Sequence, residues 1–164
     1  MTRLSESIAI KAPIEEVFEV ISDFENYPEF LHEIVAARIV KRAKGKAEVD
    51  FTAQIVSRIN YTLDMKLSPP GRIDWSLIKG EFMEGNDGSW ELAKLEPRLT
   101  DATFSVEMRF PMWVPKSFAE GTLKSGLPKM LREVKQEAET RFAKKTAKKP
   151  PAKPKKKPAA KKSR

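Results

Sequence analysis

The chain has 164 residues, which is enough for one domain of ordinary size with a substantial core. Its net charge of +8 is unevenly distributed, because residues 143–164 hold 11 of the 31 Lys and Arg residues and no acid, so residues 1–142 carry −3. The absence of cysteine excludes disulfides and thiolate metal sites, and the single histidine excludes multi-histidine metal sites, so no cofactor or metal is expected. No segment has the pattern of a secretion signal or a membrane span, so we expect a soluble, cytoplasmic protein.

The first thirty residues predict one strand followed by two short helices. Apolar residues within positions 4–10 favour the strand. A stripe with helical spacing predicts a helix over about residues 13–22. Asn26 is placed to cap a second, shorter helix. That helix is too small to bury Tyr27 and Phe30 by itself, so it is a candidate lid over another part of the protein.

The middle of the chain predicts an antiparallel sheet. Apolar and polar residues alternate in six runs, at about residues 35–39, 47–55, 61–67, 73–77, 90–92 and 102–110. A short connection over residues 56–60 predicts a hairpin, and the cluster 84–88 predicts a turn. Because no long helical pattern interrupts the runs, we expect them to form a meander. With the first strand, the sheet has about seven strands.

A long amphipathic helix is predicted from Pro115 onwards, and it is the only element able to cover the dry face of this sheet. Gly121, Gly126 and Pro128 interrupt its pattern, which predicts either a kink near residues 124–128 or two consecutive helices. On its polar face, Glu137 and Arg141 have the spacing of a stabilising ion pair.

The order of these elements is that of a helix-grip fold, and the opening motif supports a family resemblance. APIEEVF at residues 12–18, followed by SDFENYPEF at residues 22–30, resembles the START-like (SRPBCC) superfamily. That superfamily includes polyketide cyclases/dehydrases, lipid-transfer domains, coenzyme Q-binding proteins and ribosome association toxins. The resemblance covers about residues 4–142. It implies an α+β fold in which a curved antiparallel sheet of about seven strands wraps around the long C-terminal helix, with an apolar cavity between them closed by the two short helices.

Fourteen residues are candidates for the wall of this cavity because they lie on the inward faces of the strands, on the final helix or at the implied entrance. They are Tyr27, Phe30, Phe51, Ile55, Leu63, Met65, Trp75, Trp90, Phe104, Val106, Met108, Leu123, Leu127 and Met130. Two interpretations are open: these residues fill a packed core, or they surround a space for a lipid-like ligand. The sequence does not separate them.

Residues near the implied entrance have two roles open to them. Tyr27, Pro28, Phe30 and His32 either gate a ligand or staple the short helices onto the sheet. The apolar segment 110–114 is either exposed to a membrane or partner or closes the open end of the grip, and we favour closure.

No catalytic residue is predicted. The sequence has no Ser–His–acid order, carboxylate pair or phosphate-binding glycine loop, and no polar group stands out inside the predicted cavity.

Residues 143–164 form a basic tail that we expect to be disordered, because it has no large apolar residue and four prolines. Its positive charges are Lys144, Lys145, Lys148, Lys149, Lys153, Lys155, Lys156, Lys157, Lys161, Lys162 and Arg164. The candidate partners are an anionic membrane surface, to which the protein would be peripheral, or nucleic acid and the ribosome. A tail that only aids solubility is the remaining alternative.

Three functions follow from these features. The first is binding or transport of a hydrophobic small molecule, lipid or quinone-like, with the tail directed at anionic surfaces. The second is a toxin-like protein that interacts with the ribosome or RNA. The third is a polyketide cyclase-like enzyme, which requires a polar group inside the cavity.

Overall fold

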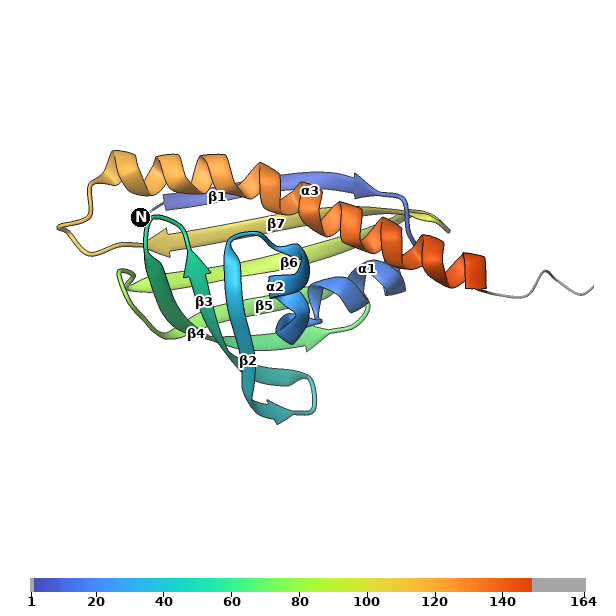
Figure 1. Ribbon diagram of the computed structural model, residues 1–164, viewed down its shortest axis with the longest axis horizontal. Helices are drawn as coiled ribbons and strands as arrows, with labels where there is room; N and C mark the ends of the chain where they lie inside the picture. The colour runs from blue at the N-terminus through green and yellow to red at the C-terminus, as the bar shows by residue number, and fades with distance from the viewer. Residues whose placement is uncertain (1, 149–164) are drawn as a thin grey trace, which may run out of the picture.

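The computed structural model describes residues 2–148, which form one curved antiparallel sheet and a long helix that lies along it (Figure 1). In chain order the elements are β1 (Thr2–Ile10), α1 (Ile14–Ile21), the 3-10 helix η1 (Phe24–Asn26), α2 (Tyr27–Phe30), β2 (Ile34–Ala43), β3 (Lys46–Gln54), β4 (Arg58–Ser68), β5 (Arg72–Gly80), β6 (Gly85–Glu96), β7 (Leu99–Arg109) and α3 (Lys116–Lys148). The strands lie in the order β1-β7-β6-β5-β4-β3-β2. The predicted seven-stranded meander and helix-grip architecture are therefore confirmed.

The two short helices follow β1 as expected, but their ends differ from the prediction. Pro13 is the N-cap of α1 and lies just outside the helix. Asn26 precedes α2, yet its side chain does not cap that helix. Its Nδ2 instead donates to both carboxylate oxygens of Asp23 at 3.0 Å. The prediction of a side-chain cap at Asn26 was wrong: the amide is oriented toward Asp23, and Oδ1 accepts no hydrogen bond from the first turn of α2.

Two turns are shorter than predicted, and both differences matter for the cavity. Ile55 lies in the turn between β3 and β4 and not at the end of a strand. Residues 85–88 belong to β6 and not to a turn. Gly88 serves close packing, because a Cβ at this position would lie 2.3 Å from Cζ2 of Trp75. Only glycine therefore lets the Trp75 indole lie against the β6 backbone.

Helix α3 is one continuous helix with Pro128 inside it, and Figure 1 shows it changing direction near its middle. Of the two predicted alternatives, the single bent helix is the one found, as expected where proline removes a backbone hydrogen bond. In its second half Leu131, Val134 and Ala138 are fully or almost fully buried against the sheet and α1. Between Lys116 and Gly126, only Ala119 is buried.

Helix α3 also extends six residues beyond the predicted domain boundary at Phe142. Residues 143–148, including Lys144, Lys145 and Lys148 of the predicted tail, are helical. No proline lies between Phe142 and Pro150, and Nζ of Lys145 pairs with Glu16 at 2.9 Å and with Glu19 at 3.0 Å. For these six residues the expectation of disorder was wrong. The rest of the tail lies outside the described residues.

Polar contacts fasten the second half of α3 to the first helices. The predicted Glu137–Arg141 pair is present at 2.7 Å, and Arg141 also pairs with Asp23 at 2.9 Å. The Arg141 guanidinium lies over the ring of Phe30, 5.5 Å from its centroid. This half of the helix is thus held by burial and by charge together.

Candidate functional site

An apolar cavity of about 590 Å³ lies between the sheet and the first half of α3. This volume is within the range of small-molecule sites, roughly 300–1,000 Å³. Thirteen of the fourteen predicted residues line it: Tyr27, Phe51, Ile55, Leu63, Met65, Trp75, Trp90, Phe104, Val106, Met108, Leu123, Leu127 and Met130. Phe30 does not line it. The helix therefore leaves the hollow of the sheet incompletely filled.

One end of the cavity is closed by stacked aromatic rings. Tyr27 stacks on Phe51 with 5.8 Å between centroids, and Phe51 stacks on Tyr61 at 5.5 Å. The hydroxyl of Tyr27 donates to the carbonyl of Ile21, which ties α2 to α1. Burial, and then the neighbouring Tyr61 and Asp23, raise the pKa of Tyr27, so this hydroxyl keeps its proton. These contacts match a stapling role for the segment.

Unlike Tyr27, the other residues of the implied entrance lie outside the cavity. Phe30 packs edge-on against Tyr27, with 5.7 Å between centroids, and does not reach the cavity wall. Most of the His32 side chain is exposed, and its Nδ1 lies 3.8 Å from a carboxylate oxygen of Glu133. Neither Pro28 nor His32 is part of the lining. The segment placed at the entrance by resemblance thus supplies a wall through Tyr27 and no opening of its own.

Exposed apolar residues border the cavity at the turns. We call Ile55, Val56, Phe82, Trp113 and Phe118 the apolar rim, because each lines the cavity and is also exposed to solvent. They come from the β3–β4 turn, the β5–β6 loop, the β7–α3 loop and the start of α3. The rings of Phe82 and Trp113 meet edge to face at 5.5 Å. The opening of the cavity therefore lies at these turns.

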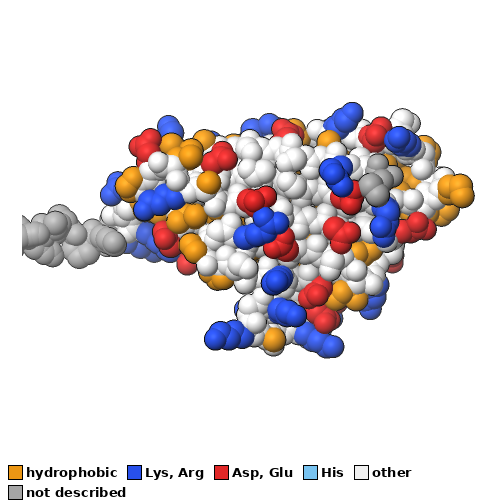
Figure 2. Space-filling model, turned by 180° about the vertical axis from the view of Figure 1, so that it is seen from behind, with side chains coloured by type: hydrophobic (Ala, Val, Ile, Leu, Met, Phe, Trp, Pro, Cys, Tyr) orange, Lys and Arg blue, Asp and Glu red, His pale blue; other side chains and the backbone are white. Residues whose placement is uncertain are grey.

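The segment 110–114 has a divided role. Phe110 and Val114 line the cavity, in keeping with the closing role that we favoured, while Trp113 is 66% and Met112 fully exposed. Figure 2 shows hydrophobic side chains at the end of the molecule where the β7–α3 loop projects. On the same face, acidic and basic side chains are interspersed.

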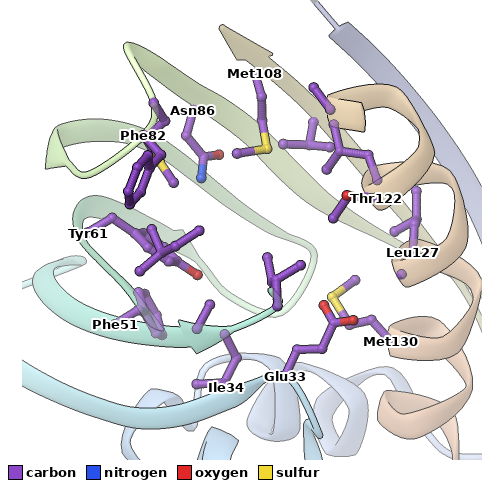
Figure 3. A pocket seen from close by; sticks show the side chains of 18 of the residues that line it. Glu33, Ile34, Phe51, Tyr61, Phe82, Asn86, Met108, Thr122, Leu127 and Met130 are labelled. Atoms are coloured by element: carbon purple, nitrogen blue, oxygen red, sulfur yellow. The ribbon is translucent and has the colours of Figure 1, made fainter. Parts of the chain in front are cut away.

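Polar side chains line the cavity, although none stood out there in the sequence. Figure 3 shows four of them, Glu33, Tyr61, Asn86 and Thr122, pointing into the space from just before β2, from β4, from β6 and from α3. Ser57, Lys129 and Glu133 are the other polar residues of the lining. Tyr61 follows from the sequence, because the alternation of β4 places it on the same face as Leu63 and Met65. None of the four was among the predicted residues, although the signal for Tyr61 was present. A turn-like setting hid Asn86, and no periodicity marks Glu33 or Thr122.

Asn86 is held by a buried hydrogen bond. Nε1 of Trp75 donates to Oδ1 of Asn86 at 3.0 Å, and both residues are less than 10% exposed. The contact depends on Gly88, which lets the Trp75 ring lie against β6. The result is an amide of fixed orientation in an apolar wall.

Glu33 lies where β2 begins, beside the first half of α3. Its Oε1 is 3.4 Å from the position that a Cβ on Gly126 would occupy, so the carboxylate lies against α3 at this glycine. Burial, and then the charge of Glu33, raise the pKa of the Tyr61 hydroxyl, which remains protonated at neutral pH. The cavity lining thus contains neutral hydrogen-bond donors together with the carboxylate of Glu33.

Metal ligands do not gather in this site. Within residues 2–148, no group of three or more His, Cys, Asp or Glu side chains is placed to hold a metal ion. Over the same residues, no helix has both the length and the apolar character needed to cross a membrane. The arrangement is suited to enclosing an apolar molecule and hydrogen bonding to it.

Comparison with solved structures supports the fold. The ZhuI aromatase/cyclase from Streptomyces sp. R1128 superposes with a TM-score of 0.76 at 17% identity, covering 85% of this chain and 94% of that one. A START superfamily protein from Mycobacterium smegmatis gives a TM-score of 0.74 at 18% identity, covering 87% and 97%. At these identities the likeness concerns the fold alone.

Sequence relatives include two bacterial toxins. The persistence and stress-resistance toxin PasT of Escherichia coli O6:H1 is 24% identical over 112 residues, which is 67% of this chain and 70% of PasT. The ribosome association toxin RatA of Vibrio cholerae serotype O1 is 27% identical over 111 residues, or 66% and 73%. The family model described as polyketide cyclase / dehydrase and lipid transport matches residues 10–135. The chain therefore belongs to the polyketide cyclase/dehydrase and lipid transport family.

Proposed function

We propose that this protein binds a hydrophobic small molecule, lipid or quinone-like, in the cavity beneath the first half of α3. The observation that carries the proposal is the apolar cavity of about 590 Å³. Burial of apolar surface contributes roughly 25 cal/mol per Å², so a ligand that covers this wall is held mainly by the hydrophobic effect. Family membership adds support, because lipid transport is part of the family's description.

The apolar rim supports exchange of the ligand with its surroundings. Val56 and Trp113 are 73% and 66% exposed, although they border the cavity. Large apolar side chains that remain exposed around a cavity commonly mark a binding site. A ligand that enters at the rim passes from these side chains directly to the inner wall.

Native mass spectrometry of the purified full-length protein tests the proposal. We expect a bound mass that organic extraction releases, or uptake of the apolar probe N-phenyl-1-naphthylamine after delipidation. A Thr122→Phe variant places a ring in the cavity and should lose both signals. Thr140→Phe, on an exposed position of the same helix, is the matched control and should keep them. The absence of both signals in the unmodified protein would contradict the proposal.

A second candidate function is interaction with the ribosome, which the likeness to RatA favours. The basic tail is the segment that would supply affinity for RNA phosphates, and such binding falls steeply with salt. Sedimentation of ribosomes with the full chain, and with a chain that ends at Lys148, tests this candidate. Removal of the tail should weaken binding at low salt. Equal, salt-independent binding by both chains would remove the tail from the account.

A further inference from the structure

The wall of the cavity contains a buried side-chain amide whose oxygen accepts a hydrogen bond and whose nitrogen donates none to the part of the chain that the structure describes. Asn86 is 8% exposed, lies on β6 and lines the cavity. Its Oδ1 accepts the hydrogen bond from Trp75. Within residues 2–148, no side chain or backbone group accepts a hydrogen bond from its Nδ2. Figure 3 shows the amide nitrogen directed into the cavity.

The orientation of this amide follows from the chemistry of its partner. The indole Nε1 of Trp75 carries a hydrogen and can only donate, so it selects the oxygen of Asn86 and not the nitrogen. The two N–H groups of Nδ2 are therefore presented to the cavity. Gly88 protects this arrangement, since any larger residue there would displace the Trp75 ring. The site is thus a preoriented donor in an apolar wall.

A second donor faces the same space. The hydroxyl of Tyr61 points into the cavity in Figure 3. Burial raises its pKa, and the charge of Glu33 raises it further, so it remains a neutral hydroxyl. The charged residues in the lining are Glu33, Glu133 and Lys129, two carboxylates against one ammonium. An anionic head group therefore finds little compensating charge.

We propose that the cavity selects a neutral apolar ligand that carries an acceptor oxygen, such as a carbonyl, and that Nδ2 of Asn86 donates to that oxygen. The inference rests on the proposed function and names its ligand class. A pure hydrocarbon would leave a buried donor without a partner, which is unfavourable. A site with a directed polar group rejects analogues that lack the matching atom more strongly than an apolar pocket rejects a small change in size.

A matched pair of probes tests the proposal on the full-length protein. Dissociation constants of 2-acetylnaphthalene, which has a carbonyl oxygen, and of 2-isopropylnaphthalene, its near-isosteric hydrocarbon, are measured at pH 8. The Asn86→Asp variant keeps an acceptor for Trp75 but replaces the donor that faces the cavity. We expect the preference for the ketone over the hydrocarbon to be about 3- to 10-fold smaller in this variant, as one hydrogen bond predicts. Gln136→Glu, an exposed amide-to-acid change on α3, should leave the preference unchanged.

The outcomes separate this inference from the proposed function. If neither probe binds the unmodified protein, both the cavity function and this inference fail. If both bind and Asn86→Asp keeps the full ketone preference, only the inference is overturned. Should Asn86→Asp fail to fold by circular dichroism, Trp75→Phe takes its place, because it removes the donor that orients the amide. A preference unchanged in Trp75→Phe would then overturn the inference.

Discussion

The two halves of α3 are parts of one continuous helix, yet they have different roles. Its second half buries Leu131, Val134 and Ala138, and ion pairs and a hydrogen bond tie it to α1 and to the backbone just after β1. Its first half buries only Ala119 before Leu127 and lies over the cavity. Helical spacing alone does not distinguish a face that fills a core from one that covers an empty space. The difference arises from what lies beneath each half, because the first half faces the cavity and the second half is packed against β1 and α1.

The largest effect should come from truncating matched leucines in the two halves. Leu131 is 2% exposed in the core, so Leu131→Ala should lower the free energy of unfolding by about 2–5 kcal/mol. Leu123 is partly exposed and already faces the cavity, so Leu123→Ala should cost less than about 1 kcal/mol. Urea denaturation of both variants measures the difference. Equal losses would mean that the first half packs as a core element.

A smaller, stabilising effect is expected at Gly121 in the first half. A Cβ at this position would meet no atom within 4 Å, so Gly121→Ala gains helix propensity without a clash. We expect the free energy of unfolding to rise by about 0.5–1 kcal/mol. Gly126→Ala is the control and should gain less, because its Cβ would lie 3.4 Å from Oε1 of Glu33. Destabilisation by Gly121→Ala in the same urea assay would show that this part of the helix has a closer neighbour.

The smallest effect should be a pH dependence that belongs to the second half. Burial alone would raise the pKa of Glu139, but the hydrogen bonds from Lys135 and from the backbone N–H of Lys11, with their charges, lower it overall. A carboxyl whose pKa is lower in the folded state stabilises the fold above its ordinary pKa of about 4.5 and loses this contribution as the pH falls. Glu139→Gln should therefore cost a few tenths of a kcal/mol at pH 7.

The loss of unfolding free energy caused by Glu139→Gln should shrink below about pH 4.5, where Glu139 of the unmodified protein also becomes protonated. Urea midpoints of the two proteins at pH 7 and at a pH well below 4.5 measure it. If the difference in urea midpoint between the two proteins stays constant or widens as the pH falls, folding does not lower the pKa of Glu139. Gln136→Glu, which adds an exposed carboxyl next to this network in sequence, serves as a control for general charge effects.

The fold could be predicted from the sequence, while the polar part of the site could not. Periodicity indicated the strands and helices, because it depends only on which face of each element is buried. It also placed most of the apolar wall, since inward-facing residues line the space whether it is filled or empty. Composition assigned Asn86 and Gly88 to a turn, but both belong to a strand. There the Trp75 ring packs on Gly88, and its Nε1 donates a hydrogen bond to Asn86. Such pairings exist only once β5 and β6 are side by side.

The predicted lid, helix α2, illustrates a second limit of prediction from the sequence. Tyr27 was correctly placed against the cavity, but resemblance put the entrance at α2, where stacked rings and the Tyr27 hydrogen bond close the wall. The exposed residues around the opening come from three separate turns and the start of α3, and no single segment reveals them. Exposure is a property of the assembled fold, so a rim of this kind has no local signature in the sequence.

Hydrogen exchange along α3, measured with and without bound N-phenyl-1-naphthylamine, tests the central claim most directly. If the first half covers a binding cavity, the amides of residues 116–126 should gain protection when the probe binds. The amides of residues 131–142, which are already packed against the sheet and α1, should change little. Equal changes in both halves, or no change in the first half at saturating probe, would contradict the account.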